Sequence, residues 1–396
     1  MRSDDDMTVD ELRELSPVAL RRAFAAMAEA RVQQMIDDHP AFIGNTDGVP
    51  FRVRIAANAH NLRDAVADEV RQGRSDGVRA HSLRVLLTPE HRRERRFITF
   101  ANTAAGRVIE MAGEFTPTTT TAAVYVPGTG TRLDESVRNH EAAWNLARRT
   151  GGPVFLFMDG DLPQDMGHTT LLRALRSYAR AETSAVGPIG WFTGTVSGVG
   201  GFIRRVLGSM AESAMDPTYA IEMAPRLVEF ARQLDQEIAE HCPGTRTTVI
   251  GHSYGGSVVG TAEQLGLRAD RVVHASSAGA GVLDGGWRNP NPTVERFSMT
   301  APGDLIQYVR WLPANPHGAK PDSMPGVFRM DTGWYDDRSR DELVQGPSGH
   351  GEYWNHPDST AFANLVRVIR GERPTPFVRR VDERPLAVLW QVLRRR

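Results

Sequence analysis

The residues with the clearest chemical potential form a short turn near the middle of the chain. Residues 251–255 read Gly-His-Ser-Tyr-Gly, the pattern G-x-S-x-G, between an apolar segment that favours a strand and one that favours a helix. A serine at such a junction sits on a tight, strained turn, and the flanking glycines leave room for it. Free N–H groups at the start of the following helix favour negative charge there. The pattern predicts Ser253 as a nucleophile, with an ordinary structural turn as the alternative.

A serine hydroxyl is a weak nucleophile and needs a general base. In known enzymes that carry a nucleophilic serine on such a turn, the acid and then the histidine follow the serine along the chain. His350 lies in a glycine-rich loop just before the last helical segment, so it is predicted as the base. His274 falls inside a predicted strand, His317 lies in a loop that no strand feeds, and His356 is the second choice.

The base needs a carboxylate to orient it. Asp304 follows a Pro-Gly turn at the end of the predicted strand at 294–301, where a parallel sheet presents its functional groups. Asp284 and Asp331 are rival positions. His252 adjoins the serine, so its side chain should diverge from the hydroxyl, and we interpret it as structural.

Acyl transfer also requires donors for the oxyanion. The backbone N–H of Tyr254, directly after the nucleophile, is the first expected donor. The second is predicted in the loop at 127–130, which follows an earlier strand. We expect the Thr129 N–H there, with Gly130 as the alternative.

Two patterns raise the question of a cofactor or a metal ion. Gly128-x-Gly130 after a strand begins a dinucleotide-binding fingerprint, but Leu133 stands where the third glycine belongs. Asp159 and Asp161 could form a carboxylate pair, but no further ligand pattern accompanies them, so we expect a loop that lines the cleft. The sequence thus predicts no cofactor and no metal.

Composition limits the function classes. The chain has 396 residues, 40% hydrophobic and 24% charged, with a net charge of −1, which does not favour nucleic acid as a partner. Cys242 is the only cysteine, so an intrachain disulfide is excluded. The acidic N-terminus has no apolar core typical of a secretory signal, so a cytoplasmic location is expected, with non-classical export as an alternative.

The first part of the chain, residues 1–80, is expected to be helical. Thr8 and Glu11 have the spacing of a capping box, and Ser16 with Pro17 is a strong helix start. One apolar stripe is then expected along a single helix that ends at Pro40. It comprises Val18, Phe24, Ala25, Ala28, Val32, Met35 and Ile36. A further helix is predicted from about Phe51, and the region is interpreted as a scaffold packed on the rest.

Residues 81–376 are predicted to form an α/β domain. Short β-rich segments come first, and strands then alternate with helices, which is typical of a mostly parallel sheet covered by helices on both faces. Strands are expected at 82–88, 95–101, 107–113, 121–128, 153–159, 247–251, 271–278 and 294–301. Helices are expected at 134–150, 225–242, 256–266 and 360–371, and residues 377–396 are expected to be a C-terminal helical tail.

An insertion at about 162–215 interrupts this alternation. Residues 183–203 carry no charge and many glycines, so we expect an apolar cap or lid over the active site. Insertion of this segment into a membrane is the alternative, which the basic C-terminal residues could assist.

Three segments, at 43–58, 126–131 and 248–256, together resemble an actinobacterial α/β-hydrolase family of unassigned function. They read IGNTDGVPFRVRIAAN, VPGTGT and TVIGHSYGG. The resemblance implies an α/β-hydrolase fold and a triad of Ser253, Asp304 and His350. The sequence therefore predicts a serine hydrolase of the carboxylesterase or lipase type, acting on a small ester with a lipophilic acyl group. A lipase or phospholipase at a membrane surface and an interaction protein on a hydrolase scaffold are the alternatives.

Overall fold

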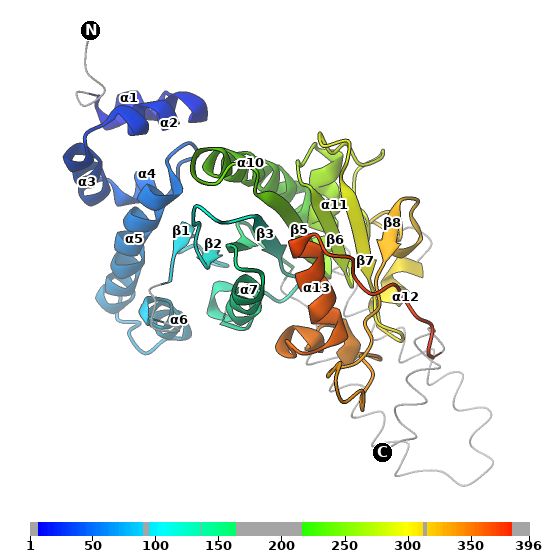
Figure 1. Cartoon of the computed structure of the whole chain (residues 1–396). Helices are drawn as coiled ribbons and strands as arrows, with labels where there is room; N and C mark the ends of the chain where they lie inside the picture. The colour runs from blue at the N-terminus through cyan, green and yellow to red at the C-terminus, as the bar shows by residue number, and fades with distance from the viewer. Residues whose placement is uncertain (1–6, 90–94, 136, 164–215, 312–314, 382–396) are drawn as a thin grey trace.

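The centre of the protein is an eight-stranded sheet with the strand order β1-β2-β4-β3-β5-β6-β7-β8 (Figure 1). The computed structural model describes residues 7–89, 95–135, 137–163, 216–311 and 315–381. β2 is antiparallel to both of its neighbours, and the six strands from β4 to β8 in the sheet order run parallel. The strands are β1 (Phe97–Ala101), β2 (Arg107–Ala112), β3 (Thr121–Val126), β4 (Val154–Met158), β5 (Arg246–His252), β6 (Arg271–Ala275), β7 (Glu295–Met299) and β8 (Val327–Arg329).

Helices cover both faces of this sheet (Figure 1). On one face, α10 (Thr218–His241) and α11 (Tyr254–Gln264) enclose an apolar core. On the other, α7 (Val137–Thr150) and α13 (Thr360–Arg370) enclose a second one. β3 and β4 are buried along their whole length, as expected for strands covered on both sides. The predicted mostly parallel α/β architecture is confirmed.

Six helices precede the sheet and form a region with its own small core. They are α1 (Val9–Arg13), α2 (Pro17–Ala26), α3 (Glu29–Asp38), α4 (Pro40–Asn45), α5 (Phe51–Arg71) and α6 (Val78–Leu87). The Thr8 capping box and the Ser16 cap are confirmed. The single long helix is wrong: Met27 is extended and separates α2 from α3, and Val18 of the expected stripe is 49% exposed.

The strand predicted at 82–88 is also wrong, because these residues belong almost entirely to α6. The run of leucine and valine resembles a strand, but the buried positions Ala80, Leu83 and Leu86 recur every three residues, which is a helical spacing. The helical region therefore extends to Leu87, beyond the expected boundary at residue 80. The first strand starts only at Phe97.

The helical region is packed tightly against the sheet domain. Phe51 at the start of α5 stacks on Phe230 of α10 with ring centroids 5.7 Å apart, and its N–H donates to Glu237 at 2.8 Å. Arg21 of α2 bonds to both Glu237 and Glu240. These apolar and charged contacts join the helical region to α10.

Other predicted features fall partly or wholly outside the described residues. Almost all of the expected cap at 162–215 does so, and so does most of the tail; residues 377–381 of the tail are not helical. Over the described residues, no helix combines the length and apolarity needed to cross a bilayer.

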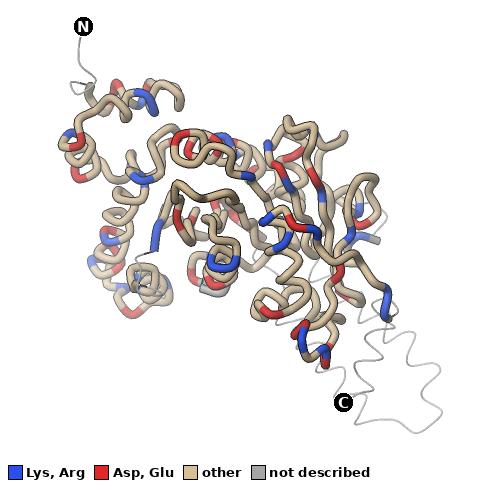
Figure 2. Tube along the Cα trace, viewed as in Figure 1, with Lys and Arg blue, Asp and Glu red and all other residues tan. Residues whose placement is uncertain are grey.

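Acidic and basic residues lie interspersed on α10 and the N-terminal helices (Figure 2). The short elements near the C-terminal half are α12 (Ile306–Trp311), η3 (Pro321–Ser323), η4 (Ser348–His350) and η5 (Glu352–Asn355), and η2 (Leu133–Glu135) precedes α7.

Candidate active site

Ser253 occupies a sharp turn between β5 and α11. Its φ of 56° and ψ of −122° lie in a region that residues with side chains rarely adopt. β5 ends at His252 and α11 begins at Tyr254, so the whole reversal is made at one residue. A strained residue of this kind persists only where its surroundings hold it, and such residues cluster at functional sites.

The glycines around Ser253 are required by close contacts. A Cβ at Gly255 would lie 2.2 Å from the carbonyl oxygen of Val126 at the end of β3. A Cβ at Gly256 would lie 2.0 Å from Oγ of Ser277. The start of α11 can therefore approach the neighbouring strand ends only without side chains at these positions.

Ser253, His350 and Asp304 form a continuous chain of hydrogen bonds. Nε2 of His350 lies 3.0 Å from Oγ of Ser253, and its Nδ1 lies 3.0 and 3.1 Å from the two carboxylate oxygens of Asp304. Three separate elements supply the side chains: the turn after β5, the loop after β7, and η4. The Gly346 N–H donates to the Pro302 carbonyl at 2.7 Å, which ties the loop of the histidine to the loop of the acid.

All three side chains are buried, and Asp304 has no exposed surface. Burial raises the pKa of the Asp304 carboxyl, but the charge of His350 and its hydrogen bond outweigh burial. The pKa of Asp304 consequently lies below the usual value of 3.8, with further help from the Ile306 N–H at 2.9 Å. At neutral pH the carboxylate is ionised, so it accepts the Nδ1 proton of His350 and directs Nε2 toward the serine.

The rival residues lie elsewhere. His274 is buried in β6, where burial lowers its pKa to about 3, and it stacks on Trp287. His356 is exposed against Tyr335. His317 is buried with its ring 5.2 Å from that of Tyr254.

The rival carboxylates are also accounted for. Asp284 is exposed, and Asp331 pairs with Arg380 at 2.7 Å.

The loop after β3 lies directly against the serine. A Cβ at Gly128 would be 2.6 Å from the Cβ of Ser253, so a residue with a side chain does not fit at this position. The Gly130 N–H donates to the Pro163 carbonyl at 2.8 Å and is not free for an oxyanion. Thr129 is half-buried between these two glycines. The Tyr254 side chain points toward α10, where its hydroxyl donates to the Asp216 carbonyl.

His252 has a role that sequence reasoning underestimated. Its Nε2 lies 2.8 Å from the backbone carbonyl oxygen of His350, and its ring packs against Trp354. It therefore supports the segment that carries the base. Its place beside Ser253 in the sequence was the only signal available.

The two carboxylates considered as a metal site, Asp159 and Asp161, have different surroundings. Asp159 pairs with Arg107 at 2.6 Å, and Asp161 is exposed. In the described part of the chain, no group of three or more His, Cys, Asp or Glu side chains is arranged to hold a metal ion.

Comparisons with known proteins agree with this architecture. A family model described as "Alpha/beta hydrolase" matches residues 163–314, which include Ser253 and Asp304. Together with the mostly parallel, helix-covered sheet, this match identifies an α/β-hydrolase fold. No curated protein sequence matches the chain.

Several solved hydrolases are distantly similar. A dienelactone hydrolase from Anabaena variabilis has 13% identity over 52% of this chain and 71% of its own, with a TM-score of 0.27. A dienelactone hydrolase-like promiscuous phosphotriesterase from metagenomic libraries has 13% identity over 69% of this chain and 98% of its own, with a TM-score of 0.31. An esterase from Pyrobaculum calidifontis has 11% identity over 79% of this chain and 97% of its own, with a TM-score of 0.32.

Proposed function

We propose that the protein is a serine hydrolase that cleaves carboxylic esters through an acyl-enzyme. The observation that carries this proposal is the chain of hydrogen bonds from the buried Asp304 carboxylate through His350 to Oγ of Ser253. A hydroxyl, an imidazole and an ionised carboxylate in this order form an activated nucleophile with its base and its orienting group.

In the proposed first step, Oγ of Ser253 attacks the ester carbonyl carbon while Nε2 of His350 accepts the hydroxyl proton. The tetrahedral oxyanion is stabilised by the backbone N–H groups of Thr129 and Tyr254. The intermediate collapses, the C–O bond to the alcohol breaks, and His350 returns the proton to the departing alcohol. Water then repeats the sequence on the acyl-enzyme, which releases the carboxylic acid and regenerates the serine.

Labelling with a fluorophosphonate probe tests the nucleophile directly. We expect the probe to modify Ser253, identified by peptide mass spectrometry, and to abolish hydrolysis of p-nitrophenyl esters. Ser253→Ala and His350→Ala should each lower kcat by several orders of magnitude. Ser339→Ala, which changes an exposed serine away from the site, is the matched control. Near-full esterase activity of Ser253→Ala would remove the basis of the proposal.

We propose further that the ester carries a lipophilic acyl group. The support is the apolar sequence at 183–203, which lies outside the described residues. A series of p-nitrophenyl esters from short to long acyl chains tests this, with the protein in which 187–203 is replaced by a short polar linker. An unchanged chain-length preference in that variant would contradict a cap over the site.

The alternative of a lipase or phospholipase at a membrane surface is tested with liposomes. Binding that disappears when 187–203 is replaced would favour this alternative. Absence of binding, together with faster hydrolysis of small soluble esters, would favour a simple lid.

A role in association is the remaining alternative, and it rests on the helical N-terminal region. The contacts of Phe51 and Arg21 with α10 favour a scaffold instead. Deleting residues 1–74 separates the two, because a scaffold leaves an insoluble remainder and a partner-binding region leaves an active one.

A further inference from the structure

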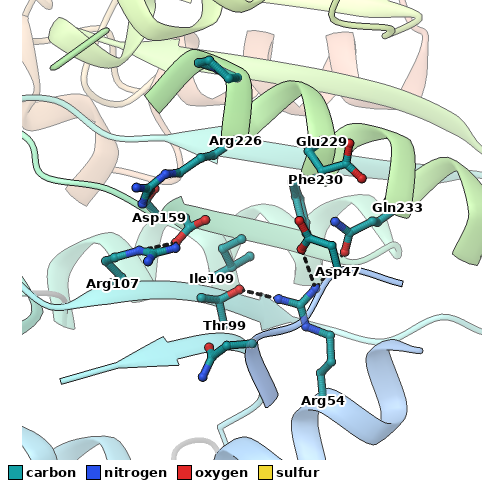
Figure 3. A pocket seen from close by; sticks show the side chains of 12 residues that line it. Asp47, Arg54, Thr99, Arg107, Ile109, Asp159, Arg226, Glu229, Phe230 and Gln233 are labelled. Carbon is teal, nitrogen blue, oxygen red and sulfur yellow. Dashed lines mark hydrogen bonds and ion pairs between the residues drawn. The ribbon is translucent and has the colours of Figure 1, made fainter. Parts of the chain in front are cut away.

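A cavity of about 370 Å³ lies where the helical N-terminal region meets the sheet (Figure 3). Its walls come from the loop between α4 and α5, from α5, from β1 and β2, from the end of β4, and from α10. The residues of the candidate active site do not line it. Asn45 and Asp47 of this wall belong to residues 44–50, which read GNTDGVP. The proposed esterase chemistry does not use this segment.

The floor of the cavity contains an arginine whose guanidinium is hydrogen-bonded within the protein. Arg54 is 2% exposed, and its guanidinium donates to the Ile98 carbonyl at 2.8 Å, to Gln233 at 2.7 Å and to Thr99 at 2.8 Å. Its donors are used within the protein, so Arg54 fixes the geometry of the floor and is not the group that recognises a ligand.

One end of the cavity is basic. Arg107 pairs with the Asp159 carboxylate at 2.6 Å, and Arg226 donates to the backbone carbonyl of the same residue at 3.3 Å. Figure 3 shows both guanidinium groups beside Asp159. Arg226 therefore contacts the backbone of Asp159 and not its carboxylate, and over the described residues it makes no ion pair. An anionic group that enters here would meet an unneutralised guanidinium.

The other end is acidic. Among the described residues, the Asp47 carboxylate forms an ion pair with Arg54 at 3.4 Å, and its side chain is 47% exposed. Glu229 lies three residues after Arg226 on α10, and over the described residues its ion pair is with Arg232, whose side chain is exposed. In the view of Figure 3, Asp47 and Glu229 lie to the right of the two arginines of the basic end.

We propose that this cavity binds a free α-amino acid with an apolar side chain. The carboxylate of the ligand pairs with Arg107 and Arg226, and its ammonium group pairs with Asp47 and Glu229. A simple anion would use only the basic end, and a simple cation would use only the acidic end, whereas an α-amino acid carries a charge for each. Ile109 and Phe230 supply the apolar part of the lining, against which the side chain packs.

Titration calorimetry with three matched compounds tests the proposal on the full-length protein. The compounds are leucine, 4-methylpentanoate, which lacks the ammonium group, and 3-methylbutylamine, which lacks the carboxylate. We expect leucine to bind and each half-ligand to bind at least about tenfold more weakly, since each loses one charged contact. Absence of leucine binding, or equal binding of leucine and 4-methylpentanoate, would overturn the proposal.

Two variants on the outer surface of α10 give a cross-test. Arg226→Gln should weaken leucine about tenfold and bring its affinity close to that of 3-methylbutylamine. Glu229→Gln should instead bring leucine close to 4-methylpentanoate. Arg22→Gln and Glu222→Gln, exposed helix positions outside the cavity, are the matched controls. Wild-type affinity in both cavity variants would place the ligand elsewhere and overturn the site.

The same titrations in Ser253→Ala keep this proposal separate from the proposed esterase activity. We expect leucine to bind this variant as it binds the wild-type protein, because the cavity and the serine share no residue. Failure of ester hydrolysis would then leave the binding result intact, and loss of leucine binding in Ser253→Ala would count against a separate site.

Discussion

Nε2 of His252 donates a hydrogen bond of 2.8 Å to the backbone carbonyl oxygen of His350. The two residues are 98 positions apart, and one precedes the nucleophile while the other is the candidate base. The bond joins the turn of the serine to the loop of the histidine, the two segments that carry Oγ and Nε2 of the candidate pair. We therefore regard His252 as a positioning residue.

His252→Ala should lower kcat by about tenfold with little change in KM, because a lost hydrogen bond of ordinary strength loosens the base. His252→Gln, whose amide N–H groups can still donate, should recover part of kcat. The measurement is steady-state hydrolysis of a p-nitrophenyl ester, with thermal unfolding as the check on folding. Equal rates for the alanine and wild-type proteins would show that the bond does not position the base.

Asp304→Asn should lower kcat by up to about 10⁴-fold, because the neutral amide no longer fixes the tautomer and orientation of His350. Binding should change far less, since Asp304 is fully buried beneath the histidine. Pre-steady-state labelling by a fluorophosphonate gives the rate at Ser253 independently of the substrate. Asp284→Asn, at the exposed rival position, serves as the control and should behave as wild type.

The proposed oxyanion donor Thr129 can be tested by changing only its backbone. Replacing Thr129 by its α-hydroxy acid analogue turns the N–H into an ester oxygen and should lower kcat by about 10²- to 10³-fold. The same replacement at Gly130 removes its bond to the Pro163 carbonyl and should leave kcat much less affected. A larger loss of kcat from the Gly130 replacement than from the Thr129 replacement would show that Gly130 is the oxyanion donor.

Gly255→Ala should abolish activity and destabilise the fold, because the added Cβ would meet the Val126 carbonyl at 2.2 Å. Backbone lies on both sides of this contact, so neither neighbour can rotate away. Gly286→Ala, where a Cβ meets nothing within 4 Å, is the matched control. Circular dichroism melts and ester turnover of the two variants give the comparison, and an active, stable Gly255→Ala protein would contradict the described turn.

A pH-dependent contribution to stability is expected from Glu110 of β2. Burial raises the pKa of its carboxyl, but hydrogen bonds from Arg95 at 2.6 and 2.7 Å and the contact with His140 at 2.9 Å outweigh burial. The pKa falls from 4.5 to about 2. A folded-state pKa below the unfolded value stabilises the protein above the unfolded value, and the stabilisation is lost as the pH falls from about 4.5 toward 2.

The shift corresponds to a free energy on the order of 3 kcal/mol. Urea unfolding of the wild-type protein and of Glu110→Gln is measured from neutral pH downward. The free energy of unfolding should fall more steeply with decreasing pH in the wild type. Glu222→Gln changes an exposed glutamate and should keep the wild-type slope. Parallel slopes for Glu110→Gln and the wild type would show that this carboxyl keeps its ordinary pKa.

The local pattern of the sequence determined the nucleophile turn, the alternating strands and helices, and the helix starts at Thr8 and Ser16. These features depend on neighbouring residues: glycines around a serine, a hydroxyl before a helix, and apolar periodicity. Local patterns were misleading at Met27, where the apolar stripe continues although the helix ends, and at residues 82–88. A leucine- and valine-rich run at 82–88 fits either a strand or a helix, and packing of Leu83 and Leu86 against α5 and β1 decides for the helix.

The tertiary structure decided which residues meet. Asp304 and His350 stand 46 positions apart, and the base lies 97 positions after the serine, distances over which chain spacing sets no geometry. Only the order of the strands in the sheet brings the loops after β5 and β7 beside η4. Asp47 and Glu229 likewise line one cavity, because the start of α5 packs against α10 through Phe51 and Phe230. Nothing in the separate segments indicates that contact, since the burial of Phe51 against Phe230, which holds the segments together, is a property of the folded chain.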